Sequence, residues 1–265
     1  IGLALGIKQP VLLFVAYWGM RFKWKVLFGC ALGVVAFFYL IPGSIVGFAK
    51  IHTYNVQWFH AIIYSPEGTS MAQEAGTDSS AHGGSLLGFM GKYLRHSDAS
   101  NHADTPIYIN LVDWTPRTIK LLHEAFALLT VSGLFLLTRR RTDSETLNHW
   151  RLLCELAIVG TLTLLISPIS HKAHFVMLYM TSIITVYGYR QLQCKSRLVL
   201  SCLLIAFIGS VLRTETMTIY GSITIATLAL LVANVYLHLR IQEKDLEIPL
   251  NEPILPPLSQ AKSID

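Results

Sequence analysis

The chain contains few charged residues for its length. Of its 265 residues, 14% are charged and 52% are hydrophobic, whereas soluble globular domains carry about 25% charged residues. The composition therefore argues against an ordinary soluble domain and indicates a membrane protein.

Cysteine is also scarce, and its placement indicates neither a metal site nor a redox site. None of the four cysteines has C-x-x-C spacing, and all lie in or just beyond apolar runs: Cys30, Cys154, Cys194 and Cys202. Such cysteines most often serve as small buried hydrophobic residues. No carboxylate cluster resembles the metal site of nucleotide-sugar transferases, so the sequence predicts no metal and no cofactor.

The first residues, IGLALGIKQPVLLF, lack both an initiator methionine and a charged segment before the apolar stretch. A secretory signal would carry that charged segment. We therefore expect this sequence to be the C-terminal part of a longer protein.

Seven apolar runs approach the ~20 helical residues that cross about 30 Å of hydrocarbon. They cover residues 2–20, 26–48, 118–138, 152–168, 174–189, 198–212 and 219–238. Pro10 and Pro42 interrupt the first two runs, so we expect six or seven spanning helices. The pattern predicts an all-α fold, a polytopic transmembrane helical bundle over residues 1–240.

Every second connector between these runs is rich in basic residues. Because cytoplasmic loops are enriched in Lys and Arg, the alternation predicts the orientation, and it explains the net charge of +5 without nucleic acid. The basic residues are Arg21, Lys23 and Lys25, then Arg139, Arg140, Arg141 and Arg151, then Arg190, Lys195 and Arg197, and finally Arg240 and Lys244. We expect a bacterial plasma-membrane protein whose Pro-rich tail, residues 241–265, is disordered and cytoplasmic.

The outer connectors include a loop of roughly 70 residues over 49–117, a length that usually indicates function or disorder. Two stretches in it, IHTYNVQWFHAII and GGSLLGFMGKYLRH, predict helices with an apolar stripe opposed by His, Lys and Arg. Such helices suit the headgroup region of a membrane. The stripes consist of Ile51, Tyr54, Trp58 and Ile62, and of Leu86, Met90 and Tyr93 or Leu94.

Lys8 is the first candidate functional residue. At about 1.5 Å per helical residue it lies about 20 Å from Arg21, inside the hydrocarbon. A charge at that depth is costly and indicates a functional site with an anionic partner. If residues 1–10 instead form a re-entrant turn at the outer surface, Lys8 is solvated and has no such role.

The second candidate is the polar hinge SPISHKAH, residues 167–174. Ser170 can cap the N-terminus of the next helix, which would place His171 and His174 on one face. The amides of that helix start can bind an anion, and Lys172 and the histidines can add charge or transfer a proton. The alternative is a polar surface loop without chemistry.

Two acidic residues, Glu124 and Glu155, lie within the apolar runs. His123 and Glu124 lie near the outer surface, where they either face the same cavity or, for Glu124, extend towards water. Glu155 lies a turn from the cytoplasmic end of its run, beside Arg151, so we predict an interfacial ion pair.

Three elements, in chain order, resemble a known family. They are K-x-P at Lys8 and Pro10, the loop stretch GGSLLGFMGKYLRH, and S-P-I-S-x-x-x-H at Ser167, Pro168, Ile169, Ser170 and His174. The order resembles the C-terminal half of glycosyltransferase family 87, the polyprenyl-phosphate-mannose-dependent mannosyltransferase-like family with the GT-C fold.

The two motifs depart from that family at several positions. The family's N-Q-S-L is matched by Gly83, Gly84, Ser85 and Leu86. In its S-P-I-S-W-x-H-H, His171 replaces Trp and Ala173 replaces one His, while His174 keeps its place.

The resemblance implies a GT-C-type enzyme that transfers a sugar, typically mannose, from a polyprenyl phosphate to a lipid-linked or glycolipid acceptor on the outer face. Its partners would be membrane lipids, that donor and that acceptor. The predicted substrate-binding residues are Lys8, Ser85, Ser170, His171, Lys172 and His174. The family's acidic base is expected upstream of Ile1, so we expect this piece to be inactive alone.

Two other functions compete with this one. A polytopic transporter or flippase would show charges along a pathway near the midplane and internal repeats. A non-catalytic membrane scaffold would not need the long outer loop.

Overall fold

The computed structural model describes residues 12–63, 85–96, 107–139, 145–167, 176–192, 196–211 and 220–247. Every regular element in these ranges is a helix, and each of the seven apolar runs contains one, so the predicted all-α fold is confirmed. The elements are α2 (Leu12–Met20), α3 (Trp24–Val35), the π-helix η2 (Ala36–Leu40), α4 (Ile41–Val46), α5 (Phe48–Ile63), α7 (Leu86–Leu94), α8 (Pro116–Arg139), α9 (Glu145–Ile166), α10 (Val176–Gln191), α11 (Arg197–Val211) and α13 (Ser222–Glu247).

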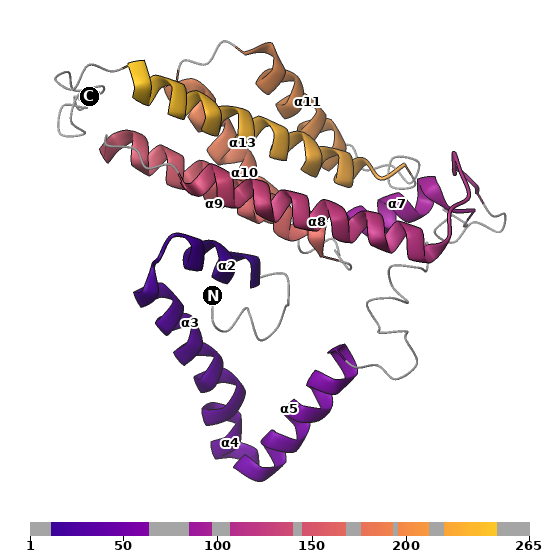
Figure 1. Cartoon of the computed structure of the whole chain (residues 1–265), viewed down its shortest axis with the longest axis vertical. Helices are drawn as coiled ribbons and strands as arrows, with labels where there is room; N and C mark the ends of the chain where they lie inside the picture. Colours follow the sequence, from indigo (N-terminus) through magenta and orange to yellow (C-terminus); the bar gives the residue numbers. More distant parts are fainter. Residues whose placement is uncertain are drawn as a thin grey trace.

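Helices α8, α9, α10, α11 and α13 form a bundle, with α2 against α8 and α9 (Figure 1). Helix α13 packs on α9, α10 and α11 through fully buried small residues, among them Ala226 and Ala233. Small residues let helix backbones approach closely, which is how helices associate where lipid removes the hydrophobic driving force.

Four helical stretches in the described part of the chain are long and apolar enough to cross a membrane. They are Trp24–Val46, Pro116–Arg139, Asn148–Ile166 and Ser222–Glu243, and the apolar stretch Arg197–Ser210 is shorter. Leu128 and Leu129 of α8 are 70% and 72% exposed, as expected for side chains that face lipid. The architecture is that of a polytopic helical membrane protein.

The described connectors between the helices of the bundle lie at its two ends, whereas the turn between α4 and α5 lies away from the bundle (Figure 1). The turn after α2, the end of α8 and the end of α13 lie at one end, which we call the basic end. Helix α7, the start of α8, the end of α9 and the start of α13 lie at the other, which we call the α7 end.

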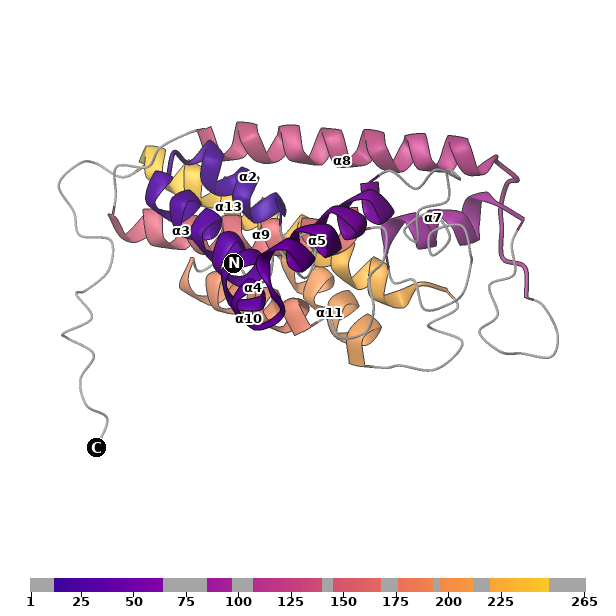
Figure 2. The same ribbon diagram turned by 90° about the horizontal axis from the view of Figure 1, so that it is seen from below.

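Helices α3 and α4 project from the bundle and α5 turns back from their tip, after Gly47 with its φ of 99° (Figures 1 and 2). Pro42 does not break this run. Because proline has no amide hydrogen, it cannot bond the Phe38 carbonyl one turn earlier. The helix widens into η2 there, and the Asn55 side-chain amide of α5 donates to the Phe38 carbonyl at 3.0 Å.

The predicted loop helices both exist, but their stripes differ in detail. Helix α5 buries Ile51 and exposes Tyr54, while the side chains of Trp58 and Ile62 lie outside the described residues. At the other end of the chain, α13 continues into the predicted tail as far as Glu247, and residues 248–265 lie outside the described part.

The close contact between α11 and α13 gives a stability prediction. A Cβ at Gly209 would lie 2.6 Å from the Ser222 carbonyl oxygen and 3.0 Å from the Ala226 Cβ. Because backbone atoms cannot rotate away, Gly209→Ala should separate the helices and lower the free energy of unfolding by about 1–3 kcal/mol. Thermal unfolding in detergent measures this change.

The matched control is Gly133→Ala in α8, where an added Cβ meets nothing within 4 Å. Alanine has the higher helix propensity, so this variant should melt at or above the wild-type temperature. Equal melting temperatures for the two variants would refute the tight α11–α13 contact.

Candidate functional site

Helix α7 lies at one end of the bundle, and its N-terminus is capped by a side chain (Figure 1). Ser85 caps the helix: its hydroxyl oxygen accepts from the Gly88 amide at 3.1 Å, and its side chain is fully buried. A serine cap satisfies an amide that the helix leaves without a carbonyl partner. Ser85, the serine that precedes the apolar stretch, is thus the start of the helix.

The face of α7 that turns inward carries a lysine. Ser85, Gly88 and Lys92 follow one another at helical spacing, and all three are buried, Lys92 with only 2% of its surface exposed. Since α7 packs on α8 and α9, this face lies towards those helices. Removal from water lowers the pKa of Lys92, because burial disfavours the charged ammonium.

This burial corrects the sequence interpretation of α7. We expected Lys92 on a polar face opposite the apolar stripe, yet it is more buried than Met90 or Tyr93 of that stripe. A signal was present in the i, i+3, i+7 spacing of Ser85, Gly88 and Lys92, which places them on one helical face.

The C-terminus of α7 is held by the segment that leads into α8. The Leu111 amide donates to the Tyr93 carbonyl at 2.8 Å, and the Trp114 amide donates to the Leu94 carbonyl at 2.7 Å. These carbonyls belong to the last turn, where the helix supplies no amide of its own. The segment therefore fixes α7 relative to α8, which begins at Pro116 directly after the capping residue Thr115.

A second contact joins α7 to the turn before α13. Gly221 has a φ of 67°, and a Cβ there would lie 2.5 Å from the Phe89 ring. The Tyr93 hydroxyl donates to the Tyr220 carbonyl at 3.3 Å. Burial raises the pKa of Tyr93, so its hydroxyl stays protonated and remains a donor.

The polar residues at the adjoining ends of α8 and α9 also turn inward. The His123 Nε2 atom lies 3.4 Å from the Leu165 carbonyl, in the last turn of α9, and Ser167 of the SPIS motif is buried. Glu124 instead points outward and lies 3.9 Å from Lys120, so it does not share the inner face with His123. The structure thus separates the two members of the His123–Glu124 pair.

Of the six sequence-predicted site residues, Ser85 is the one in the described part of the chain. Lys8, Ser170, His171, Lys172 and His174 lie outside it. Ser167, three residues before Ser170, directly follows α9, whose end lies at the same end of the bundle as α7 (Figure 1). The described border of the hinge therefore shares an end of the bundle with α7, as the topology prediction expects, whereas α5 of the long loop lies away from the bundle.

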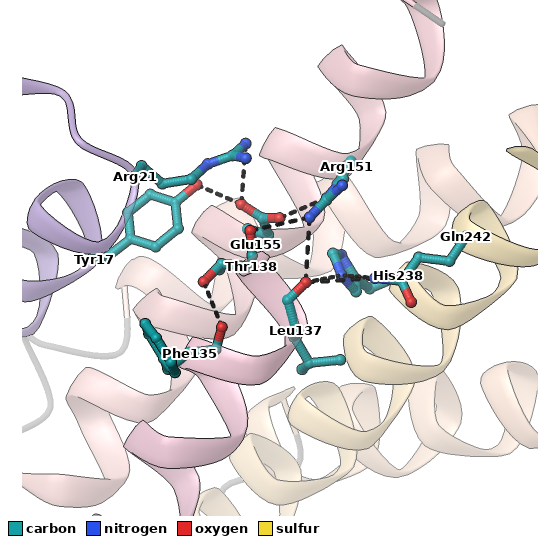
Figure 3. Close-up of polar contacts among 9 residues, drawn as sticks. All are labelled: Tyr17, Arg21, Phe135, Leu137, Thr138, Arg151, Glu155, His238 and Gln242. Atoms are coloured by element: carbon teal, nitrogen blue, oxygen red, sulfur yellow. Dashed lines mark hydrogen bonds and ion pairs between the residues drawn. The ribbon is translucent and has the colours of Figure 1, made fainter. Parts of the chain in front are cut away.

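A second polar cluster occupies the basic end (Figure 3). Glu155 accepts from the Arg151 Nε atom at 2.9 Å and from the Tyr17 hydroxyl at 2.7 Å, and it pairs with Arg21 at 3.2 Å. The predicted Arg151–Glu155 pair is confirmed, but both side chains are fully buried rather than interfacial. We call Tyr17, Arg21, Arg151 and Glu155 the arginine clamp.

The arginine clamp also satisfies the end of α8. The Leu137 carbonyl accepts from Arg151 at 3.3 Å and from the Gln242 amide at 3.4 Å, and His238 Nε2 lies 3.3 Å from it (Figure 3). Two guanidinium groups face one carboxylate, and the partial negative charge of the helix C-terminus offsets the excess. The clamp joins α2, α8, α9 and α13, which indicates a structural role.

Substitution of Glu155 tests that role. Glu155→Gln keeps the size of the side chain but leaves the buried guanidinium of Arg151 and the partly buried one of Arg21 without a carboxylate, so it should lower the free energy of unfolding by about 3–5 kcal/mol. The control is Glu243→Gln, which removes the exposed pair with Arg240 at 2.6 Å and should change the melting temperature little. Similar melting temperatures for both variants would contradict the assignment of the clamp as a structural core.

Among the described residues, no group of His, Cys, Asp or Glu side chains is arranged to hold a metal ion. The described side chains that turn inward at the α7 end include the cation Lys92 and the hydroxyls of Ser85 and Ser167. Its chemistry suits an anionic ligand.

Comparison with protein-family models matches residues 1–168 to glycosyltransferase family 87. This match covers more than half of the chain. The chain belongs to glycosyltransferase family 87. No match was found among the curated proteins or among the solved structures.

The family assignment makes the protein a membrane glycosyltransferase and disfavours the transporter alternative. The matched residues include Ser85, Lys92 and His123 and end at Pro168, inside the SPIS motif. The family 87 region thus contains the whole described part of the α7 end except the turn before α13. Helices α10, α11 and α13 follow it and pack the bundle.

Proposed function

We propose that this family 87 glycosyltransferase is of the GT-C type and transfers mannose from a polyprenyl phosphate to a lipid-linked or glycolipid acceptor. The transfer takes place at the α7 end. The observation that carries the proposal is Lys92, a lysine buried on the inner face of a loop helix that packs on α8 and α9.

The reaction determines what the site must supply. The acceptor oxygen forms a bond to the sugar C1, the bond between C1 and the phosphate oxygen breaks, and the polyprenyl phosphate leaves with the electron pair. A base takes the acceptor's proton. Because a phosphate is a weakly basic leaving group, stabilising its developing charge contributes more than protonating it.

Lys92 is suited to that stabilisation. A charge-assisted hydrogen bond from an ammonium to a phosphate oxygen is stronger than a neutral one, and it gains further where water is excluded. The donor's phosphate in turn favours the charged form of Lys92 and offsets the effect of burial on its pKa.

The remaining predicted residues complete the proposed site. Ser170, His171, Lys172 and His174 lie outside the described residues, and the described chain before them ends at Ser167, after α9. Their binding of the donor, like that of Lys8, remains a prediction. Ser85 caps α7 and so contributes at least by positioning the helix that carries Lys92.

Replacement of Lys92 tests its contact with the donor. In the full-length protein, Lys92→Met keeps the aliphatic chain and removes the charge, which should weaken donor binding by about 1.5–3 kcal/mol, roughly 10- to 150-fold. Binding and transfer of labelled polyprenyl-phosphate-mannose in membranes measure this loss.

The control is Lys120→Met. Lys120 is half-exposed at the start of α8, on the same end of the bundle, and pairs with Glu124. Its loss should leave donor binding within about twofold of wild type, since exposed pairs contribute little. A Lys92→Met enzyme with wild-type donor affinity would remove Lys92 from the site.

The lowered pKa of Lys92 predicts a pH dependence. The donor is a phosphodiester whose single negative charge does not change across neutral and alkaline pH. Lys92 loses its proton at a lower pH than an ordinary lysine, so donor affinity should fall as pH rises, earlier than an exposed lysine would allow. Titration of donor affinity against pH measures the inflection.

Lys92→Arg tests whether deprotonation of Lys92 causes this pH dependence, because a guanidinium stays charged at neutral and alkaline pH. The variant should bind the donor less tightly at neutral pH if the geometry is strict, but its affinity should not fall with rising pH. An alkaline loss of affinity that persists in Lys92→Arg would assign the titration to another group.

A further inference from the structure

The segment that holds α7, residues 107–115, has an unusual surface. Four of its apolar or aromatic side chains are exposed: Tyr108, Leu111, Val112 and Trp114, with Leu111 at 79% and Trp114 at 42%. Its backbone is nevertheless fixed, by the two bonds from Leu111 and Trp114 to the end of α7. Exposed apolar side chains on a fixed backbone indicate a contact surface rather than a loose loop.

The position of the segment indicates what it contacts. It ends one residue before Pro116, where α8, one of the four helices able to span a membrane, begins. The residues directly before a spanning helix lie at the boundary between lipid and water, where Trp and Tyr are enriched. Trp114 and Tyr108 are therefore at headgroup depth.

We propose that residues 107–115 form a membrane anchor that inserts Tyr108, Leu111, Val112 and Trp114 into the lipid headgroup layer. The charges around it fit a phospholipid surface. Arg117, in the first turn of α8, is exposed, as is Lys120 with its partner Glu124. Asp113, the acidic residue of the segment, accepts from the His96 amide at 3.0 Å and so is held by the protein.

The anchor sets the depth of α7. Two main-chain bonds of 2.8 and 2.7 Å join the segment to the last turn of α7, the turn that carries Lys92. The His96 ring also stacks on Tyr108, with ring centroids 4.3 Å apart and planes inclined by 9°. If the proposed function holds, the anchor thus keeps Lys92 level with the phosphate of a donor that lies in the same leaflet.

A surface for the acceptor's sugars is the competing assignment, because aromatic rings also pack on sugar rings. Two features favour lipid. One face of Tyr108 is covered by His96, and the most exposed members are the aliphatic Leu111 and the ring of Tyr108. Aliphatic side chains suit the boundary of acyl chains and headgroups, whereas they offer a sugar hydroxyl no hydrogen bond.

The depth of Trp114 tests the anchor without reference to catalysis. The full chain, with Trp18, Trp24, Trp58 and Trp150 replaced by Phe, is reconstituted into phosphatidylcholine–phosphatidylglycerol vesicles whose acyl chains carry bromine at a shallow or a deep carbon. We expect Trp114 fluorescence to be quenched most by the shallow bromine and little by aqueous iodide. Quenching by iodide alone would overturn the proposal.

If the variant with a single tryptophan does not fold, the wild type and Trp114→Phe are compared in the same vesicles. The shallow-bromine component of quenching should then be smaller in Trp114→Phe, and equal quenching in both proteins would overturn the proposal. Protection of Trp114 from iodide by a soluble mannose oligosaccharide, without quenching by bromine, would assign the segment to sugar instead.

A pair of substitutions separates the anchor from the proposed function. In the full-length protein, Leu111→Ser with Val112→Ser should lower transfer from a long-chain donor in a bilayer about tenfold, because the depth of the site matters there. It should leave transfer from a short-chain donor in micelles within about twofold of wild type. Lys92→Met, in contrast, should lower both. Equal loss for the serine variant in bilayer and micelle would refute the anchor and leave the role of Lys92 intact.

Discussion

Helix carbonyls without an amide partner determine where many polar side chains of this structure lie. In hydrocarbon, an unsatisfied backbone group costs several kcal/mol, so each such carbonyl needs a donor from elsewhere in the protein. Asn55 donates to the Phe38 carbonyl, to which Pro42 cannot donate, and Arg151 and Gln242 donate to the Leu137 carbonyl at the end of α8. The same requirement explains the amides of Leu111 and Trp114 at the end of α7.

Much of the fold could be predicted because hydropathy is a local property. Each apolar run, read residue by residue, became a helix, and the basic connectors grouped at one end of the bundle. The motif S-P-I-S, with the lysine and loop motifs before it, was sufficient to indicate the family that the comparison confirms. Pro42 was interpreted as an interruption of its run. The helix instead continues past Pro42 through a π-helical turn, and one side-chain amide from α5 donates to the Phe38 carbonyl.

The candidate site was less predictable because burial depends on residues far apart in the chain. Arg21 and Glu155 are separated by most of the matched region, and no local pattern pairs them. Lys92 was assigned to the polar face because the sequence interpretation treated α7 as a helix that lies on a membrane and contacts no other helix. The structure instead packs α7 on α8 and α9, so a residue assigned to the wet face is buried.

The two ends of the bundle therefore use buried cations differently. At the basic end, Arg21 and Arg151 both pair with Glu155, and these ion pairs join helices. At the α7 end, the buried Lys92 lies on a short helix that is fixed by main-chain bonds to a segment with an exposed apolar surface. If the proposed anchor and the proposed donor site hold, this arrangement keeps Lys92 at a fixed depth in the membrane, where it can bind a phosphate carried on a lipid.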